Sequence, residues 1–182
     1  TYKYLEIILI DDGSTDGSKQ LCDNLQKLDN RIVVVHKENG GVGSARNVGI
    51  EKATGFYQMF VDGDDWLEKN SVELLVENIE NFESDICFCN SYYKNAIGIK
   101  KSTHLFGNRS YSAKEIMRLH LTYGFIASPC LSLSKRDFTK GIKFREDVHT
   151  LEDWEYNFQV LSKAHLVSIL DTPYYHYRSV LG

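Results

Sequence analysis

The chain has 182 residues, of which 42% are hydrophobic and 25% charged, and its formal net charge is −4. This composition predicts one globular domain with a hydrophobic core, and it excludes both a disordered tail and a staple-dependent miniprotein. The net negative charge provides no excess of basic residues for non-specific nucleic-acid binding, so no nucleic-acid partner is expected. No apolar run reaches the length of a membrane span. The four scattered cysteines are expected to be free thiols in a reducing compartment: Cys22, Cys87, Cys89 and Cys130.

Strands and helices are predicted to alternate along the chain. Nearly continuous apolar runs indicate strands, and apolar residues at helical spacing indicate the helices between them. The expected strands are 5–10, 32–35, 56–61, 85–90, 130–134 and 166–170, and the expected helices are 21–28, 44–53, 72–82, 112–119 and 150–161. Residues 91–110 show no period and are expected to form a surface loop. This order predicts a Rossmann-like α/β domain with a mostly parallel sheet and helices on both faces.

Two of the predicted strands end in clusters of acidic residues. Asp11 and Asp12 close the first strand, and Asp62, Asp64 and Asp65 follow the third. Ligands of an open parallel sheet bind beyond the carboxyl ends of the strands, where such carboxylates repel one another unless a cation neutralises them. Because Mg²⁺ and Mn²⁺ take carboxylate oxygens and keep positions for phosphate, residues 62–65 are predicted to hold a metal or a phosphosugar. For the first cluster, a simple turn with a helix cap is an equal alternative.

Three sequence blocks stand in a characteristic order: ILIDDGSTDGS at 8–18, ENGGVGSARNVG at 38–49 and ATGFYQMFVDGDDWL at 53–67. In order and spacing they resemble the family-2 nucleotide-sugar glycosyltransferases of the GT-A fold over about the first ninety residues. LEDWEYNF at 151–158 and YYHYR at 174–178 are similar to later motifs of that family. Each block alone is weak evidence, whereas three in register are specific.

The resemblance assigns roles to particular acids. Asp11 and Asp12 match acids that contact the uracil or ribose of the donor nucleotide. Asp62 and Asp64 match the family's D-x-D, whose first acid lies by the ribose and metal and whose second binds the metal. His176 stands where related enzymes sometimes place another metal ligand, although a hydrogen-bonded, partly buried histidine is the commoner arrangement. The implied cofactor is Mg²⁺ or Mn²⁺, with Asp62, Asp64 and His176 as its ligands.

The glycine-rich segment 40–43 precedes a predicted helix and has two interpretations. Its backbone amides, Gly41 among them, could cradle the donor diphosphate together with Arg46. Equally, the glycines could serve only a tight turn and close packing of the helix on the sheet. The segment is neither a dinucleotide fingerprint nor a P-loop, because Arg46 replaces the third glycine and no Lys-Ser/Thr follows.

The resemblance also places the catalytic base near the start of the last predicted helix. Asp153 is the expected base that deprotonates the acceptor hydroxyl, and Glu152 is its substitute. Without the resemblance, the spacing from Thr150 to Asp153 favours a capping box, in which these acids only stabilise the helix start.

Together these residues imply an inverting, metal-assisted glycosyltransferase of the hexosyltransferase type (EC 2.4), acting in surface polysaccharide or glycan synthesis. The donor would be a nucleoside-diphosphate sugar, with UDP-sugars favoured, and the acceptor a glycan or a lipid-linked molecule. The family's usual setting implies a cytoplasmic enzyme. Peripheral association with the inner membrane face and formation of a homodimer are both left open. Two alternatives are a catalytically silent sugar-nucleotide-binding module and a D-x-D phosphotransferase of the haloacid-dehalogenase type. The latter is disfavoured because Asp65-Trp66 replaces that family's Gly-Thr.

The resemblance further implies how the domain is divided. Residues 1–182 would form a single GT-A domain, with a nucleotide-binding half at 1–90 and an acceptor-binding half at 91–182. The family's first strand and helix have no counterpart before Thr1, so the catalytic domain is expected to be N-terminally incomplete, and whether this chain transfers sugar by itself is left open.

Overall fold

The computed structural model describes residues 1–95, 98–102, 107–123, 128–148 and 150–178. Along the chain the elements are β1 (Ile7–Asp12), α1 (Ser18–Leu28), β2 (Ile32–Lys37), α2 (Gly41–Lys52), β3 (Tyr57–Met59), β4 (Trp66–Leu67), α3 (Ser71–Phe82), β5 (Ile86–Asn95), β6 (Gly98–Ser102), β7 (Arg109–Ser112), α4 (Ala113–Tyr123), a 3-10 turn η1 (Pro129–Leu131), β8 (Ser132–Lys135), α5 (Arg136–Thr139), α6 (Glu152–Lys163) and β9 (Leu166–Arg178). Each predicted strand and helix has a counterpart, but strands and helices do not strictly alternate, because β4, β6, β7 and α5 were not predicted.

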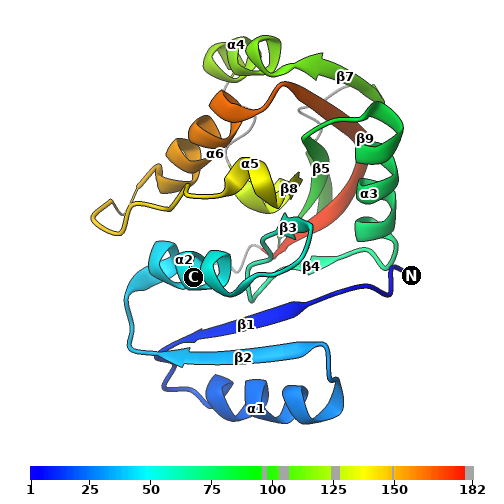
Figure 1. Cartoon of the computed structure of the whole chain (residues 1–182). Coiled ribbons are helices and arrows are strands. Elements are labelled where there is room, and N and C mark those ends of the chain that lie inside the picture. The colour runs from blue at the N-terminus through cyan, green and yellow to red at the C-terminus, as the bar shows by residue number, and fades with distance from the viewer. Residues whose placement is uncertain (96–97, 103–106, 124–127, 149, 179–182) are drawn as a thin grey trace.

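The strands form two sheets (Figure 1). In the smaller sheet, β1 and β2 run parallel, so their carboxyl ends meet and pair Asp11 with His36 and Asp12 with Lys37. The larger sheet has the order β3-β8-β5-β9-β4, with β6 added to β5 and β7 to β9. It is this sheet that positions the acidic loop after β3.

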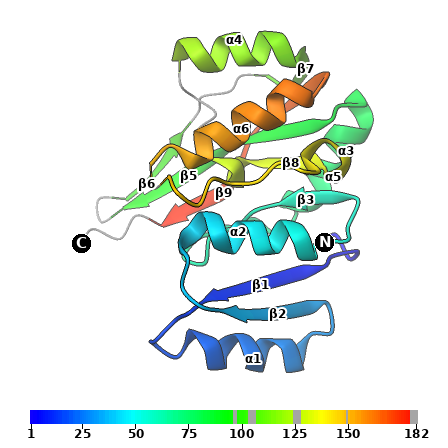
Figure 2. The same cartoon turned by 60° about the vertical axis from the view of Figure 1, so that its left-hand side comes forward.

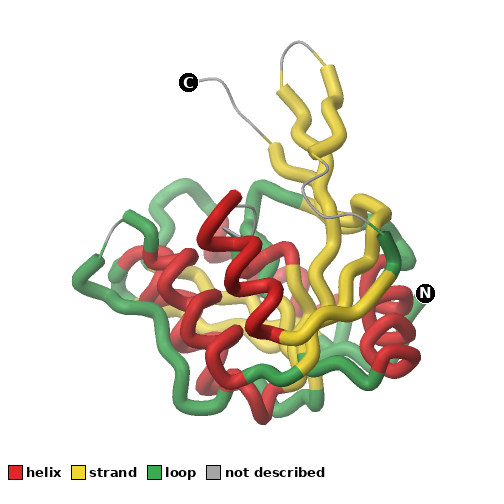
Figure 3. Tube along the Cα trace, turned by 90° about the horizontal axis from the view of Figure 1, so that it is seen from above, coloured by secondary structure: helices red, strands yellow, loops and turns green. Residues whose placement is uncertain are grey.

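The larger sheet is mixed, and the expectation of a mostly parallel sheet is wrong in this respect. Within the described residues, β1–β2 and β5–β9 are the parallel pairs, whereas β3–β8, β4–β9, β5–β6, β5–β8 and β7–β9 are antiparallel. Parallel neighbours need a long crossover, whereas antiparallel neighbours can be joined by a short turn. Residues 91–110 contain such a short connection, because β6 folds back on β5 where a loop was predicted. In Figure 3 strands extend beyond the helix-flanked body.

Helices cover both faces of the larger sheet, as predicted (Figure 2). Alternate residues of β5 point to opposite faces. Ile86 and Phe88 pack with α4 and α6 in one core cluster, whereas Cys87 and Cys89 pack with α3 in the other. The prediction that both cysteines share one face of a strand is confirmed, and all four cysteines are free thiols.

The layer of α1, β1 and β2 lies at one end of the molecule (Figure 1) and is thinly packed. None of the residues of α1 is fully buried, and Leu21 and Leu28 are exposed. The helices within the described residues are all too short or too polar to cross a membrane.

Candidate functional site

The acidic loop follows β3 and is anchored to the end of β9. The Asp62 amide donates to the Tyr175 hydroxyl at 3.2 Å, and that hydroxyl donates to Asp65 Oδ2 at 2.7 Å. Asp65 Oδ1 also accepts from the Arg178 amide at 2.8 Å. Tyr175 is fully buried, so the loop is fixed to the core at its base. Asp65 thus serves loop geometry and does not cap the next helix, which begins at Ser71.

Asp62 and Asp64, the two acids of the predicted D-x-D, have different environments. Asp62 is half-buried and accepts from Arg46 Nη2 at 2.9 Å. Asp64 is exposed, and within the described part of the chain its carboxylate has no ion-pair or hydrogen-bond partner. The protein therefore offers one paired and one open carboxylate at this loop.

Arg46 joins this loop to the predicted base. It stands on α2, its side chain is only 9% exposed, and its two terminal nitrogens reach different acids, Asp62 through Nη2 and Asp153 through Nη1. Its guanidinium also lies over the Phe144 ring, at 5.2 Å from the ring centre. Burial alone would lower the pKa of Arg46, but the charges of Asp62 and Asp153 outweigh burial and raise it. One buried cation thus brings together two of the predicted site residues.

Asp153 lies in the first turn of α6 with its side chain 28% exposed. Burial raises its pKa above the ordinary value, and the charge and hydrogen bond of Arg46 oppose that rise. A carboxylate with a raised pKa is better suited to accept a proton near neutral pH. Glu152 is half-buried beside it and adds a negative charge that also raises the pKa of Asp153.

The capping-box alternative for residues 150–153 is wrong. The residue before α6 is Leu151, in the left-handed region with φ 68°, and no side chain caps the helix. Neither Asp153 nor Glu152 is therefore needed to close the helix start by a capping hydrogen bond. Asp153 is instead paired with Arg46.

The acids at the end of β1 are held by β2 and by the glycine-rich turn. Asp11 accepts from the Ser14 amide at 3.0 Å and pairs with His36 Nδ1 at 2.8 Å, while His36 Nε2 pairs with Asp23 at 2.9 Å. The hydrogen bonds from Ser14 and His36 lower the pKa of Asp11, and its side chain is only 3% exposed. Asp11 is thus the buried member of the cluster.

The Asp12 carboxylate lies against the glycine-rich segment 40–43, where one of the two interpretations placed the donor diphosphate. Its carboxylate accepts from the amides of Gly40 at 3.0 Å and Gly41 at 2.7 Å and pairs with Lys37. Burial raises its pKa, but Lys37 and the two amides outweigh burial and lower it. The first amides of α2 therefore have an internal anion as partner. The tight-turn interpretation also has direct support, because Gly41 has φ 84°, which favours glycine.

His176 lies in an aromatic stack on β9. Its ring lies 4.8 Å from the ring centres of both Trp66 and Tyr92. Nε2 pairs with Glu68 at 2.8 Å, and Nδ1 is buried without a hydrogen-bond partner among the described residues. The structure does not bring its nitrogens together with Asp62 and Asp64 as a metal site. In the part of the chain that the structure describes, no three His, Cys, Asp or Glu residues form a metal-binding group.

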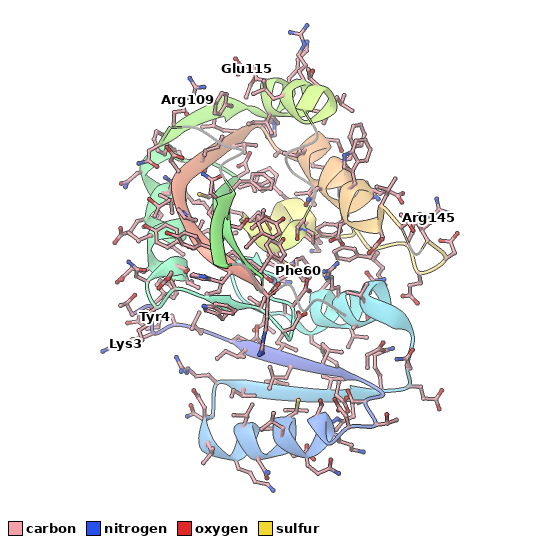
Figure 4. The ribbon with its side chains drawn as sticks, turned by 180° about the vertical axis from the view of Figure 1, so that it is seen from behind. Lys3, Tyr4, Phe60, Arg109, Glu115 and Arg145 are labelled. Atoms are coloured by element: carbon pink, nitrogen blue, oxygen red, sulfur yellow. The ribbon has the colours of Figure 1, made fainter. Side chains whose placement is uncertain are left out.

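Phe60, the residue that leads into the acidic loop, lies in the interior of the molecule (Figure 4). Its ring packs edge-on against Phe144 at 5.5 Å and Tyr156 at 5.7 Å. Sequence reasoning missed Tyr175 and Asn47, which hold the site from β9 and α2. The contacts of both residues are with segments distant in sequence, which a local motif does not reveal. The available signal was that Tyr175 lies within the block 174–178 and Asn47 within the block 38–49.

Comparison with known proteins defines the class to which this fold and site belong. The chain matches the family model for Glycosyl transferase family 2 over residues 1–142, and it belongs to this family. The solved structure of S. aureus TarS 1–349 in complex with UDP-GlcNAc has the same GT-A fold, with a TM-score of 0.81 and 25% identity over 97% of this chain.

Among curated proteins, the uncharacterized glycosyltransferase EpsJ of Bacillus subtilis is 34% identical over 98% of the chain. The minor teichoic acid biosynthesis protein GgaB of the same organism is 30% identical over 97%. The chain spans 54% of EpsJ, 20% of GgaB and 50% of the TarS structure. These relatives connect the family with glycosyl transfer and polysaccharide synthesis.

Proposed function

We propose that this chain carries the catalytic site of an inverting glycosyltransferase that moves a hexosyl group from a nucleoside-diphosphate sugar to an acceptor hydroxyl. The observation that carries the proposal is the Arg46 bridge, since one buried guanidinium contacts both the first acid of the D-x-D and the expected base. A donor held at Asp62 would therefore lie close to the carboxylate that must accept the acceptor's proton.

In the proposed reaction, Asp153 accepts the proton of the acceptor hydroxyl as its oxygen bonds to the anomeric carbon. The bond from that carbon to the diphosphate oxygen breaks, and the nucleoside diphosphate leaves. The raised pKa of Asp153 supports the assignment of the base. Inversion follows from the family resemblance, because a single in-line displacement inverts the anomeric centre.

The donor set at the acidic loop fits a hard divalent cation. Asp64 is open and Asp62 lies beside it, and Mg²⁺ or Mn²⁺ typically takes one or two carboxylates together with phosphate oxygens. When bound, such a cation would supply Lewis-acid stabilisation of the departing diphosphate. The stack around His176 gives less support to this residue as a third ligand, because its Nε2 is paired with Glu68.

The favoured donor is a UDP-sugar, because the TarS structure in the comparison was solved with UDP-GlcNAc. Asp11 and Asp12 remain the proposed contacts for the base or ribose. Asp12 is the more accessible, with 19% of its side chain exposed against 3% for Asp11. The kinship with GgaB, a minor teichoic acid biosynthesis protein, supports a role in surface polysaccharide synthesis. The glycan or lipid-linked acceptor and the cytoplasmic membrane face are proposed from the family resemblance.

A thermal-shift screen of UDP, GDP and dTDP, each with Mn²⁺ or Mg²⁺, tests the donor site. At 100 times its Kd a nucleotide stabilises by about 2.7 kcal/mol, which raises Tm by about 5–10 °C for a domain of this size. We expect UDP with metal to give this shift and Asp64→Asn to abolish it. Asp137→Asn removes an equal charge from the exposed start of α5 and should leave the shift intact.

If none of the nucleotides shifts Tm in the wild type, the donor-site proposal is wrong. If UDP binds but a UDP-sugar is never turned over with any acceptor, the silent-module alternative replaces it.

A further inference from the structure

Helix α2 holds the loop around Phe144 through Asn47, the neighbour of Arg46. The Asn47 side chain is almost fully buried. Its Nδ2 donates to the Phe144 carbonyl at 2.9 Å and to Glu146 Oε1 at 2.9 Å, while its Oδ1 accepts from the Phe144 amide at 2.8 Å. Only a side chain with a donor and an acceptor in one planar group satisfies both backbone groups of Phe144.

Phe144 passes this contact on to α6. Its ring stacks on Tyr156 with 4.1 Å between ring centres and 4° between the planes, and both residues are buried. Tyr156 stands one turn after Asp153 on α6. Helix α2 is therefore connected to the helix of Asp153 by the hydrogen bonds of Asn47 to Phe144 and by the stacked rings of Phe144 and Tyr156.

The loop has no regular structure of its own to fix it. Residues 142–145 are in neither helix nor strand, so their position depends on the side chains that contact them. Gly43 of α2 allows close approach, since a Cβ there would lie 3.3 Å from Phe144 Cβ. Together these contacts set the distance between α2 and the start of α6.

We propose that Asn47 is a positioning residue of the transfer reaction, which fixes Phe144 against Tyr156 and thereby places Asp153 relative to the donor bound at Asp62. The inference rests on the proposed function. Asn47 contacts neither donor nor acceptor in this account. Its loss displaces the base, and a displacement of about 1 Å can cost about 100-fold in rate.

The test compares Asn47→Ala and Phe144→Leu with the control Asn78→Ala. Asn78 is a buried asparagine of α3 whose amide oxygen accepts from the Cys87 thiol, on the other face of the sheet. Initial rates of UDP release from UDP-GlcNAc with Mn²⁺, with water as the acceptor, are measured over donor concentration, well below each Tm, and UDP affinity is measured by calorimetry. Phe144→Leu retains the Asn47 clamp and removes the stacked ring, so it tests the same route if Asn47→Ala fails to fold.

We expect kcat to fall at least tenfold in both variants, with KM for the donor and Kd for UDP within twofold of wild type. Asn78→Ala should lower Tm and leave kcat unchanged. The proposal is overturned if kcat is retained, if donor affinity falls in parallel with kcat, or if Asn78→Ala loses as much activity.

A second readout separates this proposal from the proposed function. In Asn47→Ala, hydrogen exchange should be faster at the Glu155 amide, which donates to the Leu151 carbonyl at 3.0 Å at the start of α6, and in the turn that follows, with α3 unchanged, whether or not the chain turns over a donor. If the wild type neither binds UDP nor releases it, the proposed function fails while the exchange result still reports on the contact. Unchanged exchange in α6 overturns the positioning role even where the wild type is active.

Discussion

Replacing the buried cation at the centre of the site, Arg46→Met, should destabilise the protein in a pH-dependent manner. Methionine retains much of the apolar length over the Phe144 ring but removes the charge and all five donors. Asp62 and Asp153 would then share a site with no cation between them. Both carboxylates would lose a charge-assisted hydrogen bond.

Removing one partner of a fully buried pair costs about 3–5 kcal/mol. Here the carboxylates keep 35% and 28% exposure, so water screens the charge that remains and we expect about 2 kcal/mol. For a domain of this length, each kcal/mol lowers Tm by about 2–4 °C, so Tm should fall by about 4–8 °C at neutral pH.

The sign of the pH dependence follows from the pKa of Asp153. Burial already raises this pKa, and the charge of Arg46 opposes the rise, so the variant's pKa should be higher still. An acid whose pKa is raised by folding binds more protons in the folded state, so its destabilising effect is present above that pKa and declines below it. The deficit of Arg46→Met against wild type should therefore narrow as pH falls.

Thermal unfolding of wild type and variant, in steps from about pH 7 to about pH 4, measures both effects. Arg145→Met is the matched control, because that arginine pairs with Asp147 at an exposed position and its loss should change stability by less than about 1 kcal/mol. The reasoning is refuted if Arg46→Met unfolds within 1 °C (about the error of the assay) of wild type, if its deficit does not narrow with falling pH, or if Arg145→Met is equally destabilised.

Three further substitutions test separate contacts. His36→Asn should lower stability most at low pH, because hydrogen bonds to its two acid partners raise the pKa of His36. The stabilisation by His36 is full below about pH 6.5 and is lost as pH rises through the raised pKa. Urea unfolding at several pH values would disprove this if the stability difference between wild type and variant grew with pH. Tyr175→Phe removes the hydroxyl that contacts the Asp62 amide and Asp65, so the free energy of unfolding should fall by about 1–2 kcal/mol. UDP binding with Mn²⁺ should also weaken, and an undiminished affinity would contradict the anchoring role. Leu151→Gly removes a left-handed leucine and should raise Tm by about 2–4 °C in calorimetry, whereas a lower Tm would show that this residue is unstrained.

The spacing of apolar residues predicted the strands and helices whose apolar side packs against the core. The alternation in residues 86–89 correctly assigned Cys87 and Cys89 to one side of a strand, and the apolar spacing of 72–82 gave α3. The β6 hairpin and β7 were missed, because their pairing with β5 and β9 is decided by partners remote in sequence and not by a period within 91–110. The same limit explains the mixed sheet, since pairing direction depends on how the chain returns to the sheet.

Three residues of the motifs, Arg46, Asp62 and Asp153, are brought together by the structure, but the motifs did not predict how they pair. One of two equal interpretations placed Arg46 against a diphosphate, and the structure pairs it with two acids from other segments of the chain. The amides of Gly40 and Gly41 were one candidate phosphate cradle, and Asp12 accepts from them. Spacing alone cannot decide between an external and an internal anion, because both satisfy the same donors.

The central claim is that Asp153, held beside the D-x-D by Arg46, is the base of a glycosyl transfer. Its most direct test is the rate of UDP release from UDP-GlcNAc with Mn²⁺, with water as the acceptor hydroxyl, in wild type, Asp153→Asn and the control Glu155→Gln, a half-buried acid in the same helical turn. We expect a loss of about 100-fold or more in Asp153→Asn alone, with the UDP-induced rise in Tm retained. A rate in Asp153→Asn equal to that of wild type, or an equal loss in Glu155→Gln, would contradict it.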